Sequence, residues 1–230
     1  MEHKKIPYEF IKCSLKKDDK EDFFKEAYSK ALGHDENNVG KVPIIFHNGK
    51  YITESSIVAR YLDQVYSDEN KYGKPLLPTD PYQRAAVEIM VDWFGGSGWI
   101  KSHYNLIRTL DKESADKQVE EWKKKWKILN DRLSEFNKEG LYLPDGQVSL
   151  FEIVAFPFFE RLVGIQQLCK YDVYTKWMEE FPRIKSWYNA VLQTDGVKKC
   201  LQKPEFFVSA YQGMRDAAAK KQEEQQKEKK

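Results

Sequence analysis

The sequence predicts an α/β domain over residues 1–75, followed by an all-helical domain over residues 80–212. A short run of β-branched and aromatic residues on either side of Asn48-Gly49 predicts a β-hairpin in the first domain. From residue 83 onward, apolar residues recur at helical spacing. The polar stretch 67–75 is rich in turn-forming residues, so it predicts a linker between the two domains.

The composition is that of a globular protein. The chain has 230 residues, of which 41% are hydrophobic, so it is long enough to bury a sizeable core. Its 38 Lys and Arg against 36 Asp and Glu leave a net charge of +2, too small an excess to neutralise nucleic-acid phosphates. No apolar run reaches the roughly 20 residues that cross a bilayer. We therefore expect a cytoplasmic protein that binds neither nucleic acid nor membrane.

The cysteines and histidines predict no metal site. Cys13, Cys169 and Cys200 are widely spaced and include no Cys-x-x-Cys pair, so neither a disulfide framework nor a zinc site is expected. The four histidines are equally scattered. Cys13 falls within a predicted strand, without the helix N-terminus or basic neighbour that lowers the pKa of a thiol. It is expected to pack in the core.

Two elements precede the hairpin. Residues 6–15 carry aromatic and β-branched side chains in rough alternation, which predicts a strand. Residues 20–24 end a charged run and predict the start of a short helix with one solvated face.

The hairpin and the helix after it form one continuous stretch, residues 41–55. Val42-Pro43 begins the first strand, and proline both removes a backbone donor and permits a cis peptide bond. Asn48-Gly49 suits a type I′ turn, which needs positive φ at both central residues. Thr53-Glu54-Ser55 then begins a helix, whose free N–H groups can hold an anion.

In this order and spacing, the stretch resembles the glutathione site of the cytosolic glutathione transferases, which is built on a thioredoxin-like domain. The resemblance implies that the backbone of Val42, next to a cis Pro43, pairs with the cysteinyl part of glutathione. It also implies that Glu54 and Ser55 hold the γ-glutamyl end. The physical chemistry agrees, because a helix N-terminus suits the carboxylate of that end and Glu54 can pair with its ammonium.

The resemblance also gives a role to Lys20. It matches a lysine of the omega-class transferases that reaches the backbone of glutathione. The segment 28–40, which includes His34, is longer than the link usual at this point in the family.

The helical domain is expected to begin with an apolar face that ends at the glycine-rich break 95–98. This face comprises Ala85, Ala86, Ile89, Met90, Trp93 and Phe94. Because the electrophile pocket of the family lies beside this helix, the resemblance makes four aromatic residues candidate pocket walls, with a plain core role as the alternative. They are Trp93, Phe94, Trp99 and Tyr104.

Three further patterns organise the helical domain. Apolar residues between Val119 and Phe136 are spaced three and four apart, as on a helix packed in a bundle, and Gly140 is expected to cap it. Ser149 and Glu152 form a capping box, which also resembles a buried box of the transferases. The run 156–162 is close to a Trp-Pro-Trp-Phe-Glu-Arg-Leu run of the omega class, and residues 181–184 are expected to begin another helix.

Residues 213–230 form a charged tail that is polar on all sides, expected to be a frayed helix, with docking of a partner as the alternative. The resemblance covers about residues 4–208. Family members open with a strand and a helix that meet at a catalytic Cys, Ser or Tyr, whereas residues 1–8 look like the end of that helix running into the second strand. The first β-strand of the thioredoxin-like domain is therefore expected to be missing, and no catalytic residue is assigned.

Two functions follow from the resemblance. One is an omega-like glutathione transferase or thiol reductase, with glutathione as a substrate and a small electrophile or disulfide as the second. The other is a non-catalytic scaffold or assembly subunit with the transferase fold. The family also implies a homodimer. Because the chain as written supplies no nucleophile at the expected position, negligible turnover is expected from it.

Overall fold

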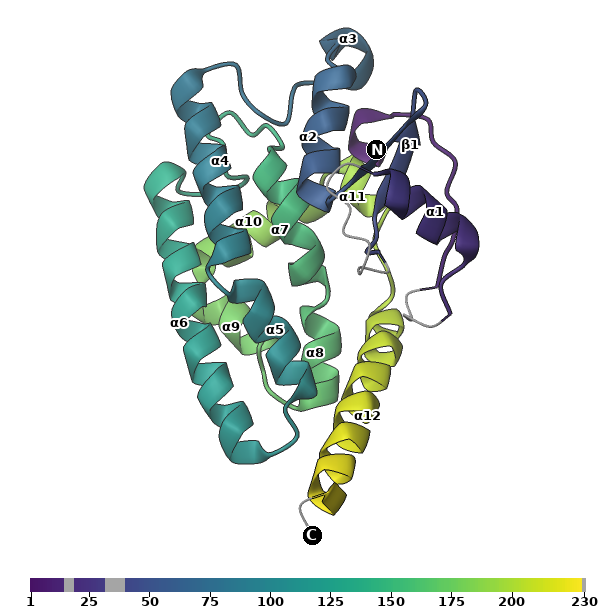
Figure 1. Cartoon of the computed structure of the whole chain (residues 1–230). Helices are drawn as coiled ribbons and strands as arrows, with labels where there is room; N and C mark the ends of the chain where they lie inside the picture. The colour runs from purple at the N-terminus through teal and green to yellow at the C-terminus, as the bar shows by residue number, and fades with distance from the viewer. Residues whose placement is uncertain (15–18, 32–39, 229–230) are drawn as a thin grey trace. The chain divides into compact units, whose positions relative to one another are not determined.

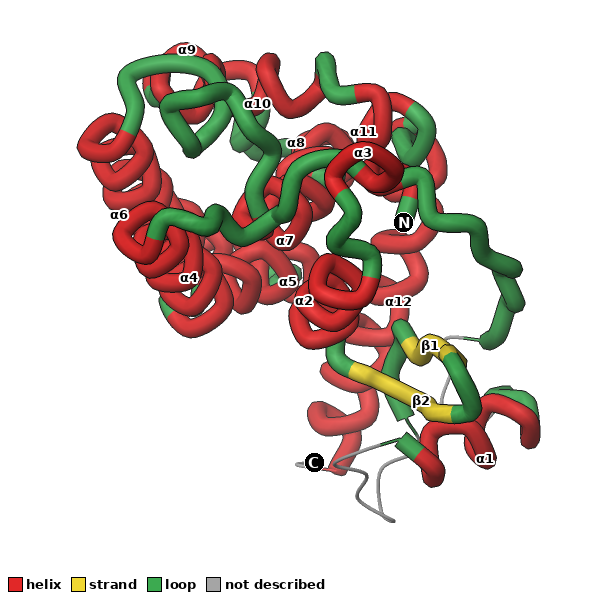
Figure 2. The backbone as a smooth tube through the Cα atoms, turned by 90° about the horizontal axis from the view of Figure 1, so that it is seen from above, coloured by secondary structure: helices red, strands yellow, loops and turns green. Residues whose placement is uncertain are grey.

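The structure, a computed structural model, describes residues 1–14, 19–31 and 40–228. The chain divides into two compact units, Met1–Leu77 and Pro78–Lys230. The described part of the first unit contains a β-hairpin and three α-helices, and that of the second contains helices without strands (Figure 1). Figure 2 shows the two strands of the hairpin side by side.

The described elements of the first unit are, in chain order, a short 3-10 turn, one helix, the hairpin and two further helices. They are the turn Glu2–Lys4, α1 (Asp22–Lys30), β1 (Ile44–His47), β2 (Lys50–Thr53), α2 (Ser55–Val65) and α3 (Glu69–Tyr72). The turn, α1 and α2 lie where the sequence predicts helical structure. The predicted linker contains one short helix, α3, because the Asp68 side chain accepts the Asn70 N–H and caps it.

The helices of the second unit are α4 (Pro81–Gly96), α5 (Trp99–Arg108), α6 (Lys112–Phe136), α7 (Leu150–Glu160), α8 (Leu162–Cys169), α9 (Thr175–Glu180), α10 (Pro182–Leu192), α11 (Asp195–Lys198) and α12 (Pro204–Glu228). No helix of the described chain is both long enough and apolar enough to span a membrane.

The predicted hairpin is confirmed. β1 and β2 run antiparallel, with Ile44 opposite Thr53 and His47 opposite Lys50. The turn residues Asn48 and Gly49 have φ of 51° and 78°, as a type I′ turn requires. On one face of the hairpin, Ile45 and Ile52 pack against a small core of Ile6, Val58 and Leu62.

The strand predicted over residues 6–15 is wrong for its described part, 6–14, which contains no strand. A strand needs a neighbour that pairs with its backbone groups. The described sheet contains only β1 and β2, and neither pairs with this segment. Phe10 and Ile11 are 74% and 64% exposed, so these two apolar side chains face solvent and do not pack in a core.

In the second unit, the predicted break is confirmed but the predicted face of α4 is partly wrong. The helix is interrupted between Gly96 and Trp99, where φ of Gly98 is 76°, and Lys125 Nζ donates to the Gly98 carbonyl at 3.0 Å. The buried side chains of α4 are Val87, Met90, Val91 and Phe94. Ile89, expected inside, is 60% exposed, because the core face of α4 is rotated from the predicted stripe.

The seam predicted on α6 is confirmed, with Trp122, Trp126, Leu129 and Leu133 fully buried. The cap predicted at Gly140 is wrong. The helix ends at Phe136, and Asn137 is already extended, with φ of −146°. Gly140, with φ of 70°, lies in the following loop, where its carbonyl accepts a hydrogen bond from buried Arg183 at 2.8 Å.

The predicted capping box at the start of α7 is confirmed and extends further than predicted. Glu152 accepts the Ser149 N–H at 2.8 Å, while the Ser149 hydroxyl caps the first turn. The second carboxylate oxygen of Glu152 accepts the Tyr142 N–H and the Trp187 indole N–H, each at 2.9 Å. A local cap therefore also connects α7 to α10 and to the preceding loop.

The segment predicted as a tail continues a helix that begins before it. α12 starts at Pro204 and buries Phe207 and Tyr211 before it reaches Gly213. Beyond Gly213, Arg215 donates to the carbonyls of Ile107 and Thr109 at 3.2 and 3.3 Å. The first turn of the predicted tail is therefore bound to the end of α5.

Candidate functional site

The end of the hairpin and the start of α2 lie next to each other. Because Ile44 is opposite Thr53, the next residues on the two strands, Pro43 and Glu54, leave the ladder on the same side. The Thr53 hydroxyl donates to the Pro43 carbonyl at 3.2 Å, and the Val42–Pro43 peptide bond is cis. The structure thus brings together Val42, Pro43, Glu54 and Ser55, which the sequence selects as binding residues.

The helix start at this place has no side-chain cap. The Glu54 carbonyl accepts the first helical hydrogen bond, from the Val58 N–H at 2.8 Å, but the Glu54 side chain caps none of the free N–H groups of α2. Glu54 has φ of 67°, which is uncommon for a residue with a side chain. Strained residues of this kind gather at ligand-binding sites.

The electrostatics of this helix start suit a ligand with charges of both signs. Uncapped N–H groups and the helix dipole attract an anion. The exposed carboxylate of Glu54, at the same end, attracts a cation. Val42 is 48% exposed, and Ser55 is exposed as well, so a ligand from solvent can reach the backbone on both sides.

Lys20 has other contacts. It is only 7% exposed, its Nζ donates to the Ser14 carbonyl at 3.2 Å, and it lies 4.3 Å from the centre of the Phe24 ring. The Glu21 carboxylate accepts the Ser14 N–H, at 2.9 Å from one oxygen. The Lys20 ammonium is therefore engaged by described residues of the first unit itself. Most of the long segment predicted between Tyr28 and Gly40, including His34, lies outside the described residues.

The four candidate pocket walls divide into two pairs. Phe94 and Trp99 are fully buried, with ring centres 5.0 Å apart, and serve the helical core. Trp93 and Tyr104 are partly exposed. The Trp93 ring lies 4.8 Å from the Arg132 guanidinium, and the Tyr104 hydroxyl accepts a hydrogen bond from Arg161 at 3.0 Å.

Two polar residues near Tyr104 were not selected from the sequence. Arg161 is the next-to-last residue of the run that resembles the omega class, and its position in that run was the available signal. His103, on α5, pairs through Nε2 with the Tyr211 hydroxyl of α12 at 2.8 Å. Burial lowers the pKa of His103 to about 3. No spacing in the sequence brings residues 103 and 211 together.

The three thiols lie in three different settings. Cys13 is half-buried in the segment without a strand, and Cys200 is exposed after α11. Cys169 ends α8, where burial raises its pKa. None of the three begins a helix. Within the described ranges, no three potential ligands from His, Cys, Asp and Glu gather as a metal site would require.

Comparisons with known proteins identify both units. The model of the "Glutathione S-transferase, N-terminal domain" matches residues 1–71, and that of the "Glutathione S-transferase, C-terminal domain" matches residues 112–190. Among solved structures, a tau-class glutathione S-transferase from mango (Mangifera indica) superposes with a TM-score of 0.76 and 19% identity. The match covers 92% of this chain and 88% of the mango chain. The fold is a thioredoxin-like domain followed by an all-helical domain.

Curated relatives match over most of the chain. Glutathione transferase GST 23 of Zea mays is 30% identical over 177 residues, which cover 76% of this chain and 74% of the maize protein. Glutathione S-transferase omega-1 of Rattus norvegicus is 28% identical over 195 residues, 84% of this chain and 69% of the rat protein. The similarity therefore extends to tau and omega classes alike. The chain belongs to the glutathione S-transferase family.

Proposed function

We propose that this protein binds glutathione at the start of α2 and uses it in conjugation or thiol transfer. The observation that carries the proposal is Glu54, an exposed carboxylate held at φ of 67° beside an uncapped helix N-terminus. Strain at one residue needs a reason, and a binding site supplies one. Membership in a glutathione-binding family supports the same reading.

Each part of glutathione has a matching group. The γ-glutamyl carboxylate accepts hydrogen bonds from the N–H groups of Ser55 and its neighbours at the start of α2. Its ammonium pairs with the Glu54 carboxylate. The cysteinyl part lies along the Val42 backbone, before Pro43. Lys20 contributes only if its ammonium leaves the Ser14 carbonyl, so we assign it no primary role.

The second substrate is a small electrophile or a disulfide. Trp93 and Tyr104, the two partly exposed candidates, are its proposed contacts, and Arg161 positions the Tyr104 hydroxyl. The relatives belong to the omega and tau classes. They are compatible both with omega-like thiol transfer and with conjugation of glutathione to an electrophile.

A non-catalytic scaffold is the second candidate function. The placement of the thiols favours it over catalysis by a cysteine, because none of the three cysteines begins a helix, where a thiolate would be stabilised. A scaffold of this family retains the glutathione site without turnover. Activity of the full chain with an electrophilic aromatic substrate and with a mixed disulfide separates the two functions.

Calorimetric titration with reduced glutathione tests the binding site. Glu54→Gln keeps the shape of the side chain and removes the charge, so we expect affinity to fall about tenfold or more, as for a lost charged hydrogen bond. Glu69→Gln, which changes an exposed acid at the start of α3, is the matched control and should leave affinity unchanged.

Cysteinylglycine, which lacks the γ-glutamyl group, gives an internal check. Its affinity should be equal for the unchanged protein and for Glu54→Gln. If Glu54→Gln binds glutathione as tightly as the unchanged chain does, the ligand lies elsewhere and the proposed site is wrong.

We also propose that a second copy of the chain covers the exposed face of α4 and α6. Tyr82 and Ile89, two turns apart on α4, are 74% and 60% exposed, and Ile128 on α6 is 45% exposed. The Tyr82 ring stacks on Phe136 of α6, with centres 6.2 Å apart, so the two helices present one surface. A two-fold axis through this surface would bury apolar side chains on both copies.

A further inference from the structure

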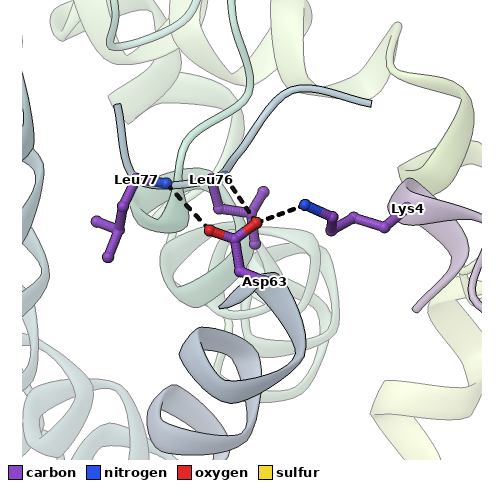
Figure 3. Close-up of polar contacts among 4 residues, drawn as sticks. All are labelled: Lys4, Asp63, Leu76 and Leu77. Carbon is purple, nitrogen blue, oxygen red and sulfur yellow. Dashed lines mark hydrogen bonds and ion pairs between the residues drawn. The ribbon is translucent and has the colours of Figure 1, made fainter. Parts of the chain in front are cut away.

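One buried carboxylate joins three separate parts of the first unit (Figure 3). Asp63 Oδ1 lies 2.6 Å from the Lys4 ammonium and accepts the Leu76 N–H at 2.9 Å. Asp63 Oδ2 accepts the Leu77 N–H at 3.4 Å. The side chains of Lys4 and Asp63 are 4% and 6% exposed, so water does not screen the pair.

These contacts fasten both ends of the unit to α2. Lys4 ends the 3-10 turn at the N-terminus of the chain, and Asp63 lies in the last turn of α2. Leu76 and Leu77 are the last two residues of the unit, immediately before Pro78 begins the next one. Their side chains are each 5% exposed. We call residues 76–77 the exit segment.

A buried ion pair adds little net stability, but the removal of one of its partners is strongly destabilising. The attraction between the two charges roughly offsets the cost of taking both out of water. Removing the ammonium alone leaves a buried carboxylate with two neutral N–H donors, and such a carboxylate must regain water. Water can reach it by displacing its other partners, the N–H groups of the exit segment.

We propose that the Lys4–Asp63 ion pair is a latch that holds the exit segment on α2. While the pair is intact, Asp63 binds both N–H groups and keeps the exit segment at the end of α2. When Lys4 is withdrawn, Asp63 becomes hydrated and the exit segment is released. The N-terminal turn thereby controls whether the exit segment stays bound to α2, although no contact between Lys4 and residues 76–77 is needed.

Hydrogen exchange in the full-length protein, read at single amides, tests the latch. In Lys4→Met, the amides of Leu76 and Leu77 should exchange at least tenfold faster, while those of β1, β2 and α6 keep their rates. Lys5→Met, which changes an exposed neighbour, should have no effect.

Two further variants separate charge from shape. Lys4→Arg keeps the positive charge and should keep both amides protected. Lys4→Met combined with Asp63→Asn removes both charges and retains a side-chain oxygen that can accept the Leu76 N–H. Its protection should therefore return toward that of the unchanged protein. Unchanged exchange at Leu76 and Leu77 in Lys4→Met, or equal acceleration throughout the first unit, would overturn the proposal.

Discussion

At the scale of single residues, His103 has its imidazole enclosed by aromatic rings, with no exposed surface. The Tyr104 and Tyr211 rings are centred 4.9 and 5.6 Å away. Burial, together with the positive charge of Arg161, lowers the pKa of His103 to about 3. The folded protein therefore holds this histidine neutral at every pH at which it is expected to work.

This histidine should make the helical unit less stable in mild acid. Since the pKa is about 6.5 in the unfolded chain and about 3 in the folded one, the unfolded chain binds more protons between these values. Between pH 7 and pH 5, His103 should lower the free energy of unfolding by about 2 kcal/mol.

Denaturant unfolding at pH 5, 6 and 7, followed by tryptophan fluorescence, measures this effect. All six tryptophans lie in the second unit, so the signal reports on it alone. His103→Gln can still bond to Tyr211 but does not titrate, so it should show the smaller loss of stability. If both proteins lose the same free energy of unfolding between pH 7 and pH 5, His103 is not the source of the acid sensitivity.

At the scale of elements, α8 and α12 lie close together at Gly164. A Cβ added there would lie 2.8 Å from Phe207 Cβ and 3.4 Å from the Val208 nitrogen. Backbone atoms of α12 are part of this contact, so a rotamer change cannot relieve it. The absence of a side chain at Gly164 is what allows Phe207 to be buried.

Gly164→Ala should therefore destabilise the second unit by about 1–3 kcal/mol, as overpacking does. Gly213→Ala, on α12 itself, is the matched control, because a Cβ there meets nothing within 4 Å. Gly213→Ala should stabilise the helix by up to about 1 kcal/mol. The fluorescence unfolding experiment measures both changes. A Gly164→Ala variant as stable as the unchanged protein would show that α12 can shift away from α8 without loss of stability.

At the scale of the whole molecule, the proposed pairing through α4 and α6 predicts a particle of twice 27.1 kDa at micromolar concentration. Ile89→Glu puts a charge in the centre of the exposed apolar stripe and should give monomers by light scattering. Leu201→Glu, which changes another exposed apolar residue, should leave the dimer intact. A monomer mass for the unchanged protein would refute the pairing.

The candidate site could largely be read from the sequence because its parts are local. Val42-Pro43 and Glu54-Ser55 flank a hairpin whose register follows from the Asn48-Gly49 turn, so their proximity needs no distant contact. The capping box at Ser149 and Glu152 is also complete within four residues. These features depend on backbone rules that act over one or two turns of chain.

Other features depend on contacts between residues far apart in sequence, and patterns along the chain do not contain them. The alternation in residues 6–14 predicts a strand, but a strand requires a partner and the described sheet supplies none. The face of α4 that becomes core was decided by the helices that pack on it, which left Ile89 in solvent.

The sequence by itself determined the hairpin, the start of α2 and the proximity of the candidate residues there, because turns, caps and amphipathic stripes are encoded in short spacings. The tertiary structure alone decided that Phe94 and Trp99 are core residues, and that Lys20 binds the Ser14 carbonyl. It also decided that Lys4 and Asp63, 59 residues apart, share one buried contact. Burial and pairing of charge depend on which elements meet, and that is a property of the folded chain as a whole.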